Sequence, residues 1–162
     1  MRWGKLLDIY VQYVIRVYGP NTVVIFDDYP DHPTTKDEAH TRHSGTSTSA
    51  CVSLQENLTV DISKKAFLVN KANTKHLIFW LINHLTKAGI ECTRAKADVD
   101  RLITISAIKC AKYYETVVHA EDTDVLILLL HMTTGNLKDI IFIPHLMKSS
   151  KRKKRSWQIQ DV

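Results

Sequence analysis

Carboxylates follow three short apolar runs of the chain, at the points where these runs end. The runs are residues 22–26, 90–93 and 116–120. The carboxylates after them are Asp27, Asp28, Asp98, Asp100, Glu121, Asp122 and Asp124. Carboxylates that gather without matching cations repel one another unless they are protonated or share a cation. Oxygen ligands without nitrogen or sulfur donors favour Mg²⁺ or Mn²⁺, ions that commonly support phosphodiester chemistry.

Apolar residues elsewhere in the chain predict the elements that must position these carboxylates. Three- and four-residue spacing predicts helices over residues 5–18, 34–43, 63–69, 70–87, 98–113 and 122–133. Short apolar runs without polar alternation, including a last one at residues 139–144, suit strands that are buried on both faces. The alternation predicts an α/β three-layer sandwich with a mostly parallel sheet. The carboxylates then converge at the carboxyl ends of the strands, where such sheets bind ligands.

The aspartates also have a simpler interpretation as helix caps. Asp98 and Asp122 stand where predicted helices begin, and an aspartate there accepts hydrogen bonds from free backbone N–H groups. Asp100 and Asp124 lie further into the helices, where no cap is needed. The spacing therefore leaves both interpretations open, a set of caps or a cation site.

Composition excludes several classes of protein. The chain has 162 residues, enough for one domain with a core, and no apolar run approaches the ~20 residues that span a bilayer. We expect an intracellular protein without a membrane contact, because polar residues interrupt the N-terminal segment. The three cysteines have neither disulfide nor zinc spacing. No glycine-rich phosphate loop is present, so no small-molecule cofactor is predicted.

Positive charge is concentrated near the C-terminus. Six of the eight residues from Lys148 to Arg155 are basic, and without them 16 basic and 17 acidic residues remain. We therefore predict a domain over residues 1–146 and a basic tail over 147–162. The run suits a solvated tail, a nuclear-import signal or a DNA or RNA contact. The contact residues would be Lys151, Arg152, Lys153, Lys154 and Arg155. Trp157 either stacks on a base or packs against the body.

Several motifs give the chain a resemblance to a known family. Residues 25–30 (IFDDYP) are similar to the VFDGxP segment of flap endonucleases, and residues 121–126 (EDTDVL) to their EDxDxL segment. Asp98-Val99-Asp100 falls where that family has an acid-x-acid pair. The segments YPDHPTTKDEAHTR, KAFLVNKANTKHLI and KAGIE resemble PIN-like domains of transposon-associated animal proteins. The chain thus resembles PIN-like, flap-endonuclease-type nucleases over residues 5–144.

The resemblance implies a PIN-like (flavodoxin-like) fold and metal-dependent hydrolysis of DNA or RNA. It implies metal-binding, catalytic roles for Asp27, Asp98, Asp100, Asp122 and Asp124. Lys36 and Arg42 fall on the helix that contacts the scissile phosphate in the family, although a solvated helix face explains them as well.

One feature of the family is missing from the pattern. Family members begin with an earlier strand that ends in an active-site aspartate, and this chain opens at Met1 without it. The alternative function is therefore a catalytically inactive, nuclease-like module that binds nucleic acid or protein, such as a transposon-derived relic.

Overall fold

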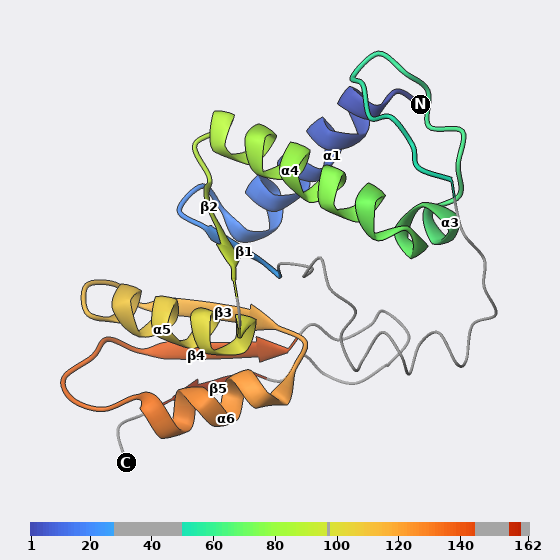
Figure 1. The fold of residues 1–162 in the computed structure, drawn as a ribbon. Coiled ribbons are helices and arrows are strands. Elements are labelled where there is room, and N and C mark those ends of the chain that lie inside the picture. The colour runs from blue at the N-terminus through green and yellow to red at the C-terminus, as the bar shows by residue number, and fades with distance from the viewer. Residues whose placement is uncertain (28–49, 97, 145–155, 160–162) are drawn as a thin grey trace, which may run out of the picture. The chain divides into compact units, whose positions relative to one another are not determined.

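The computed structural model describes residues 1–27, 50–96, 98–144 and 156–159, and these residues have an α/β fold, as predicted (Figure 1). The chain divides into two compact units, Met1–Arg94 and Ala95–Val162. The helices are α1 (Trp3–Tyr18), α3 (Lys64–Val69), α4 (Lys71–Lys87), α5 (Val99–Ala111) and α6 (Thr123–Met132). The strands are β1 (Val23–Asp27), β2 (Glu91–Ala95), β3 (Thr116–Ala120), β4 (Ile140–Pro144) and β5 (Trp157–Ile159).

In the first unit, α1 and α4 pack together beside the strand pair β1–β2. The sequence of α1 places Trp3, Leu7 and Val11 four residues apart, so all three lie on one face and are buried. Gly19 ends the helix with a φ of +88°, a conformation that glycine adopts without strain. Val11 continues into a core cluster that also contains Leu85 and Ile90.

Side-chain caps fix the corner between α3 and α4. Ser63 caps α3 through a bond that its Oγ accepts from the Ala66 N–H (3.2 Å), and Asn70 caps α4 by accepting from the Ala72 N–H (2.9 Å). The fully buried Asn73 accepts from the Val52 N–H (2.8 Å) and donates to the Ala50 carbonyl (3.0 Å). Asn73 therefore ties the irregular segment that begins at residue 50 to α4.

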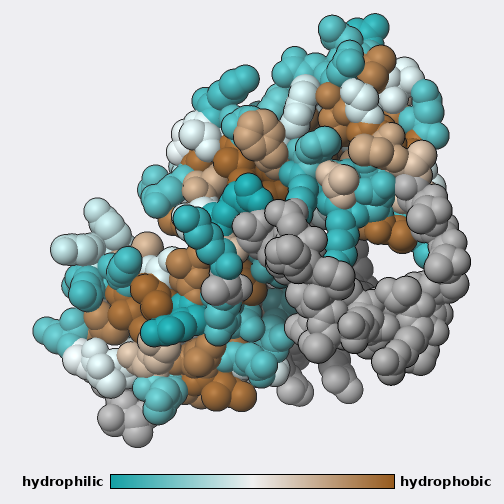
Figure 2. Space-filling view, in the orientation of Figure 1, coloured by the Kyte–Doolittle hydropathy of each residue, from teal (hydrophilic) through white to brown (hydrophobic). Residues whose placement is uncertain are grey.

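The second unit has a three-stranded sheet in the order β3-β4-β5. Strands β3 and β4 are parallel, with Thr116 opposite Ile140 and Ala120 opposite Pro144. Helices α5 and α6 pack side by side against this sheet (Figure 1). The buried core consists of Ala107, Ala111, Val118, Val125, Leu129, Ile140, Phe142 and Ile159. Apolar side chains also reach the surface over α6, where Ile127 and Leu130 are exposed (Figure 2).

The sheets differ from the predicted arrangement in two respects. The described strands form two small sheets, one of two strands and one of three, instead of one sheet. In addition, β5 is antiparallel to β4 and lies within the predicted basic tail. Trp157 contacts the ring of Phe142, with ring centroids 6.1 Å apart. Of the two roles considered for this tryptophan, stacking on a base or packing against the body of the protein, the structure shows packing. A three-residue strand beside a basic run has too little local signal to be predicted from its own sequence.

Two sequence predictions concern residues that the structure does not describe. The helix predicted over residues 34–43 and the first part of the loop predicted over 44–57 lie outside the described residues. Among the described helices, none is both long enough and apolar enough to cross a membrane.

Candidate metal centre

Helices α5 and α6 begin with aspartate caps. Asp98 accepts hydrogen bonds at Oδ1 from the N–H groups of Asp100 (3.1 Å) and Arg101 (3.2 Å). Asp122 accepts at Oδ1 from the Asp124 N–H (3.0 Å). The capping interpretation is therefore confirmed for both residues, and each cap fixes the backbone of the aspartate two positions later.

Three aspartates from these two helix starts come together. Asp100, Asp122 and Asp124 each offer a carboxylate oxygen, and these oxygens lie within 4.8 Å of one another. Asp122 and Asp124 are exposed, whereas Asp100 is partly buried. The group is able to hold a metal ion, because three carboxylates from two separate segments offer oxygen ligands in one place. We call these three residues the acidic triad.

The order of the elements explains why the triad forms. Helix α5 precedes β3 and α6 follows it, so both helices run opposite to the strand that they cover. Their first turns therefore lie at the carboxyl end of β3, and the packing of α5 against α6 brings the turns together. The prediction that carboxylates converge at this end of the strands is confirmed for the triad.

The starts of α5 and α6 partly offset the negative charge of the triad. Each helix N-terminus carries roughly half a positive charge, which favours a carboxylate in the first turn. Within the described part of the chain, neither Asp122 nor Asp124 forms an ion pair. Because both side chains face water, solvent screens their repulsion, and the arrangement is compatible with folding before a cation binds.

The other predicted site residues are not part of the triad. Asp98, which caps α5, is not in the group of three, although Asp122 belongs to the group and caps α6 in the same way. Asp27 is the exposed last residue of β1 and belongs to the first unit. The predicted phosphate and nucleic-acid contacts lie outside the described residues; these are Lys36, Arg42, Lys151, Arg152, Lys153, Lys154 and Arg155.

The strands on either side of the basic run are described and belong to the second unit. Strand β4 ends at Pro144, which lies opposite Ala120 of β3, two residues before Asp122. Strand β5 begins at Trp157, opposite Phe142 of β4. The end of β4 and the start of β5 therefore lie at the same end of the sheet as the carboxyl end of β3, which leads into α6. The sequence did not reveal this arrangement, because it depends on the pairing of β5.

A second charged group in the first unit was also missed from sequence. His84 of α4 lies 3.6 Å from Asp8 of α1 through Nδ1 and 3.6 Å from Glu56 through Nε2. Trp80, one turn earlier, stacks on the imidazole with ring centroids 6.3 Å apart. The spacing of Trp80 and His84 on one helix face was the available signal. The contacts connect three segments of the unit.

Comparisons of the sequence with protein-family models and with curated proteins, and of the chain with solved structures, found no match.

Proposed function

We propose that this chain is a PIN-like nuclease domain that hydrolyses phosphodiester bonds of DNA or RNA with Mg²⁺ or Mn²⁺. The observation that carries the proposal is the acidic triad, in which three carboxylates from two helix starts lie within 4.8 Å of one another. The motifs around residues 27, 98–100 and 121–126 support the same proposal by their resemblance to flap endonucleases. The proposed fold is the three-layer PIN-like sandwich.

The donor set suits a hard cation. All three donors are carboxylate oxygens, and Mg²⁺ prefers a few carboxylates with water in its remaining positions. The exposure of Asp122 and Asp124 leaves room for that water and for a phosphate. The chemistry that such an ion supplies when bound is Lewis-acid activation of phosphodiester hydrolysis.

Residues of the chain have distinct tasks in this proposal. Asp100, Asp122 and Asp124 hold the ion, and the caps of Asp98 and Asp122 orient the first turns that carry the triad. The resemblance implies ligand roles for Asp27 and Asp98 and phosphate-contacting roles for Lys36 and Arg42 as well.

The basic run supports a polyanionic substrate. Residues 148–155 contain six basic side chains, and they fall in the chain between the end of β4 and the start of β5. Lysine and arginine bind phosphates with release of counterions, which makes such binding strongly salt-dependent. In this proposal the run raises the affinity for a nucleic acid, which the carboxylates by themselves repel.

Cleavage of labelled flap and single-stranded oligonucleotides with Mn²⁺ tests the proposal. We expect cleavage by the parent protein and none by Asp124→Asn, which removes one triad charge and retains the side-chain shape. Glu121→Gln is the matched control, since it removes an exposed charge next to the triad but outside it. Equal cleavage by the parent and Asp124→Asn would show that the activity does not come from the triad.

The second candidate function is an inactive nuclease-like module that binds nucleic acid or protein. It is favoured by the use of Asp98 and Asp122 as caps, a role that needs no metal. A folded parent that binds oligonucleotides but neither cleaves them nor responds to Mn²⁺ would support this candidate over the first.

A further inference from the structure

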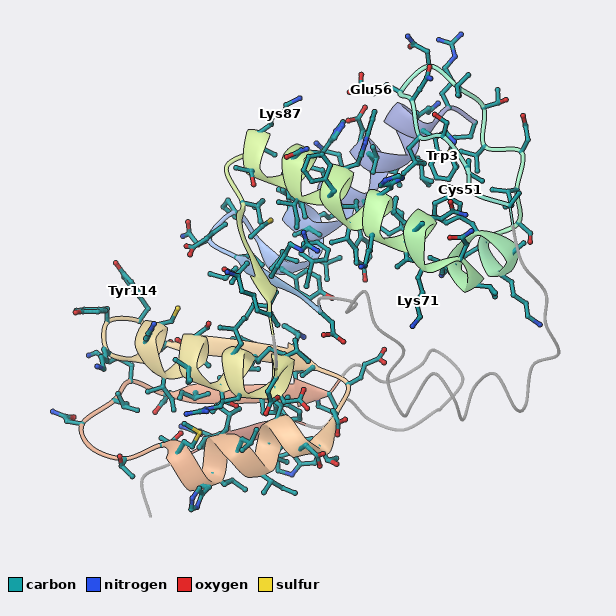
Figure 3. All side chains as sticks on the ribbon, viewed as in Figure 1. Trp3, Cys51, Glu56, Lys71, Lys87 and Tyr114 are labelled. Carbon is teal, nitrogen blue, oxygen red and sulfur yellow. The ribbon has the colours of Figure 1, made fainter. Side chains whose placement is uncertain are left out.

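Two tyrosines project from the C-terminal end of α5. Tyr113 and Tyr114 are each 72% exposed, more than any other large hydrophobic residue that is described. Their ring centroids lie 6.3 Å apart with an angle of 54° between the planes. Tyr114 points away from the ribbon (Figure 3). The N–H groups of both residues donate to the Cys110 carbonyl (3.0 and 2.9 Å), so the backbone beneath the exposed rings is fixed.

Three exposed lysines lie close to this pair, two of them along the chain and one through a backbone hydrogen bond. Lys109 lies in the last turn of α5, and Lys112 is its C-cap residue. Lys138 is held next to them, because its N–H donates to the Ala111 carbonyl at 2.7 Å. Two carboxylates are close in sequence, Glu115 and Asp139, and the second accepts a hydrogen bond from the side chain of Gln158 (3.0 Å). The helix dipole accounts for lysines at this position, but it does not account for two exposed rings.

The combination of residues fits one kind of ligand. Single-stranded nucleic acids are bound by aromatic side chains that stack on bases, next to cations that contact the phosphates. A duplex does not expose the faces of its bases for stacking. An acidic peptide would contact the lysines but would not need the two aromatic rings. We propose that Tyr113, Tyr114, Lys109, Lys112 and Lys138 form a binding surface for single-stranded DNA or RNA. We call this surface the tyrosine platform.

The tyrosine platform is separate from the acidic triad. Asp100 lies in the first turn of α5 and the tyrosines follow its last turn, so the 13-residue helix separates them by about 20 Å. Binding at the platform therefore requires no metal ion. The inference goes beyond the proposed nuclease activity and applies equally to an inactive binding module.

Fluorescence anisotropy with a labelled oligothymidine of about twelve nucleotides, within the size of one single-strand site, tests the platform in EDTA. We expect Tyr113→Ala/Tyr114→Ala to weaken binding by about tenfold or more, as loss of base stacking does. The matched control is Tyr113→Phe/Tyr114→Phe, which keeps both rings and should bind like the parent. The parent and both double variants are measured in two series, one with the natural basic run and one with residues 151–155 changed to glutamine. The second series prevents binding by the basic run from masking the effect of the tyrosines.

The lysines give an independent measurement. Replacing Lys109, Lys112 and Lys138 by glutamine should reduce the slope of log Kd against log salt by about 2, at roughly 0.7 for each single-strand phosphate contact. Thermal melting of each variant establishes that it is folded, which the exposure of these side chains favours.

Two results would overturn the inference. One is equal affinity of the parent and the folded alanine variant in both series. The other is equal binding of the parent to a base-free oligonucleotide or to polyglutamate, which would indicate an acidic partner recognised by charge alone. Because the buffer contains EDTA, either result leaves the metal proposal untouched. Asp124→Asn should conversely lose cleavage and keep its affinity for the oligothymidine.

Discussion

Changing Asp124 to asparagine should abolish the stabilisation of the protein by Mg²⁺ or Mn²⁺. A ligand that binds only the folded state stabilises it by about 2.7 kcal/mol at about 100 times its Kd. For a chain of this size, that corresponds to a rise in Tm of about 5–10 °C. The variant lacks one of three ligand charges and should show little of this rise.

Without metal, Asp124→Asn should slightly stabilise the folded protein or leave its stability unchanged. Two carboxylates 4.8 Å apart repel by about 0.9 kcal/mol in water, and about 0.1 M salt reduces this to about 0.5 kcal/mol. Asp124 has two such neighbours, so its neutralisation relieves about 1 kcal/mol. Loss of the helix-dipole interaction costs about 0.3–1 kcal/mol and offsets most of this gain.

A thermal-melting titration with Mg²⁺, Mn²⁺ and EDTA measures both effects. The Tm of Asp124→Asn should equal or slightly exceed that of the parent in EDTA and fall below it when metal is added. Glu121→Gln should follow the parent throughout. This reversal cannot come from a damaged fold, which would lower Tm in EDTA as well. An equal rise in Tm for the parent and Asp124→Asn, or no rise for the parent, would refute the acidic triad as a metal site.

Three further predictions concern the fold. Asn73→Ala should lower the free energy of unfolding in urea by about 1–3 kcal/mol, because it removes two partly buried hydrogen bonds, to the Val52 N–H and the Ala50 carbonyl, worth about 0.5–1.5 kcal/mol each. Leu129→Ala should lower it by about 2–5 kcal/mol, because this fully buried side chain leaves a cavity. Burial, as the largest cause, raises the pKa of the Cys92 thiol, so the folded state keeps this proton when the unfolded thiol ionises. The contribution of the buried thiol to stability is therefore complete below about pH 8.5 and is lost as pH rises through the folded pKa. Measured by urea unfolding, the free energy of unfolding should fall less between neutral and alkaline pH in Cys92→Ala than in the parent.

Local patterns predicted most of the secondary structure, because caps and periodicity act over a few residues. The strand predicted over residues 116–120 coincides with β3, and Ser63 caps the helix that it was expected to cap. Glycines at 19 and 89 have positive φ where helices were predicted to end. Each of these predictions depended on residues within one or two turns of each other.

The candidate site was predicted less completely, since a cap and a ligand use the same side chain at the same position. In Asp98-x-Asp100 only the second aspartate joins the acidic triad, whereas in Asp122-x-Asp124 both do. No rule of spacing distinguishes the two motifs. The difference arises from the packing of α5 against α6, which brings Asp100 toward the start of α6.

The pairing of the residues after the basic run was the least predictable feature of the chain. A three-residue strand beside a basic run has too little apolar pattern to be predicted from its own sequence. Trp157–Ile159 nevertheless pairs with β4, and Ile159 is buried in the core. These three residues therefore belong to the second unit instead of to a free tail, because a strand is fixed by a partner that is distant in sequence.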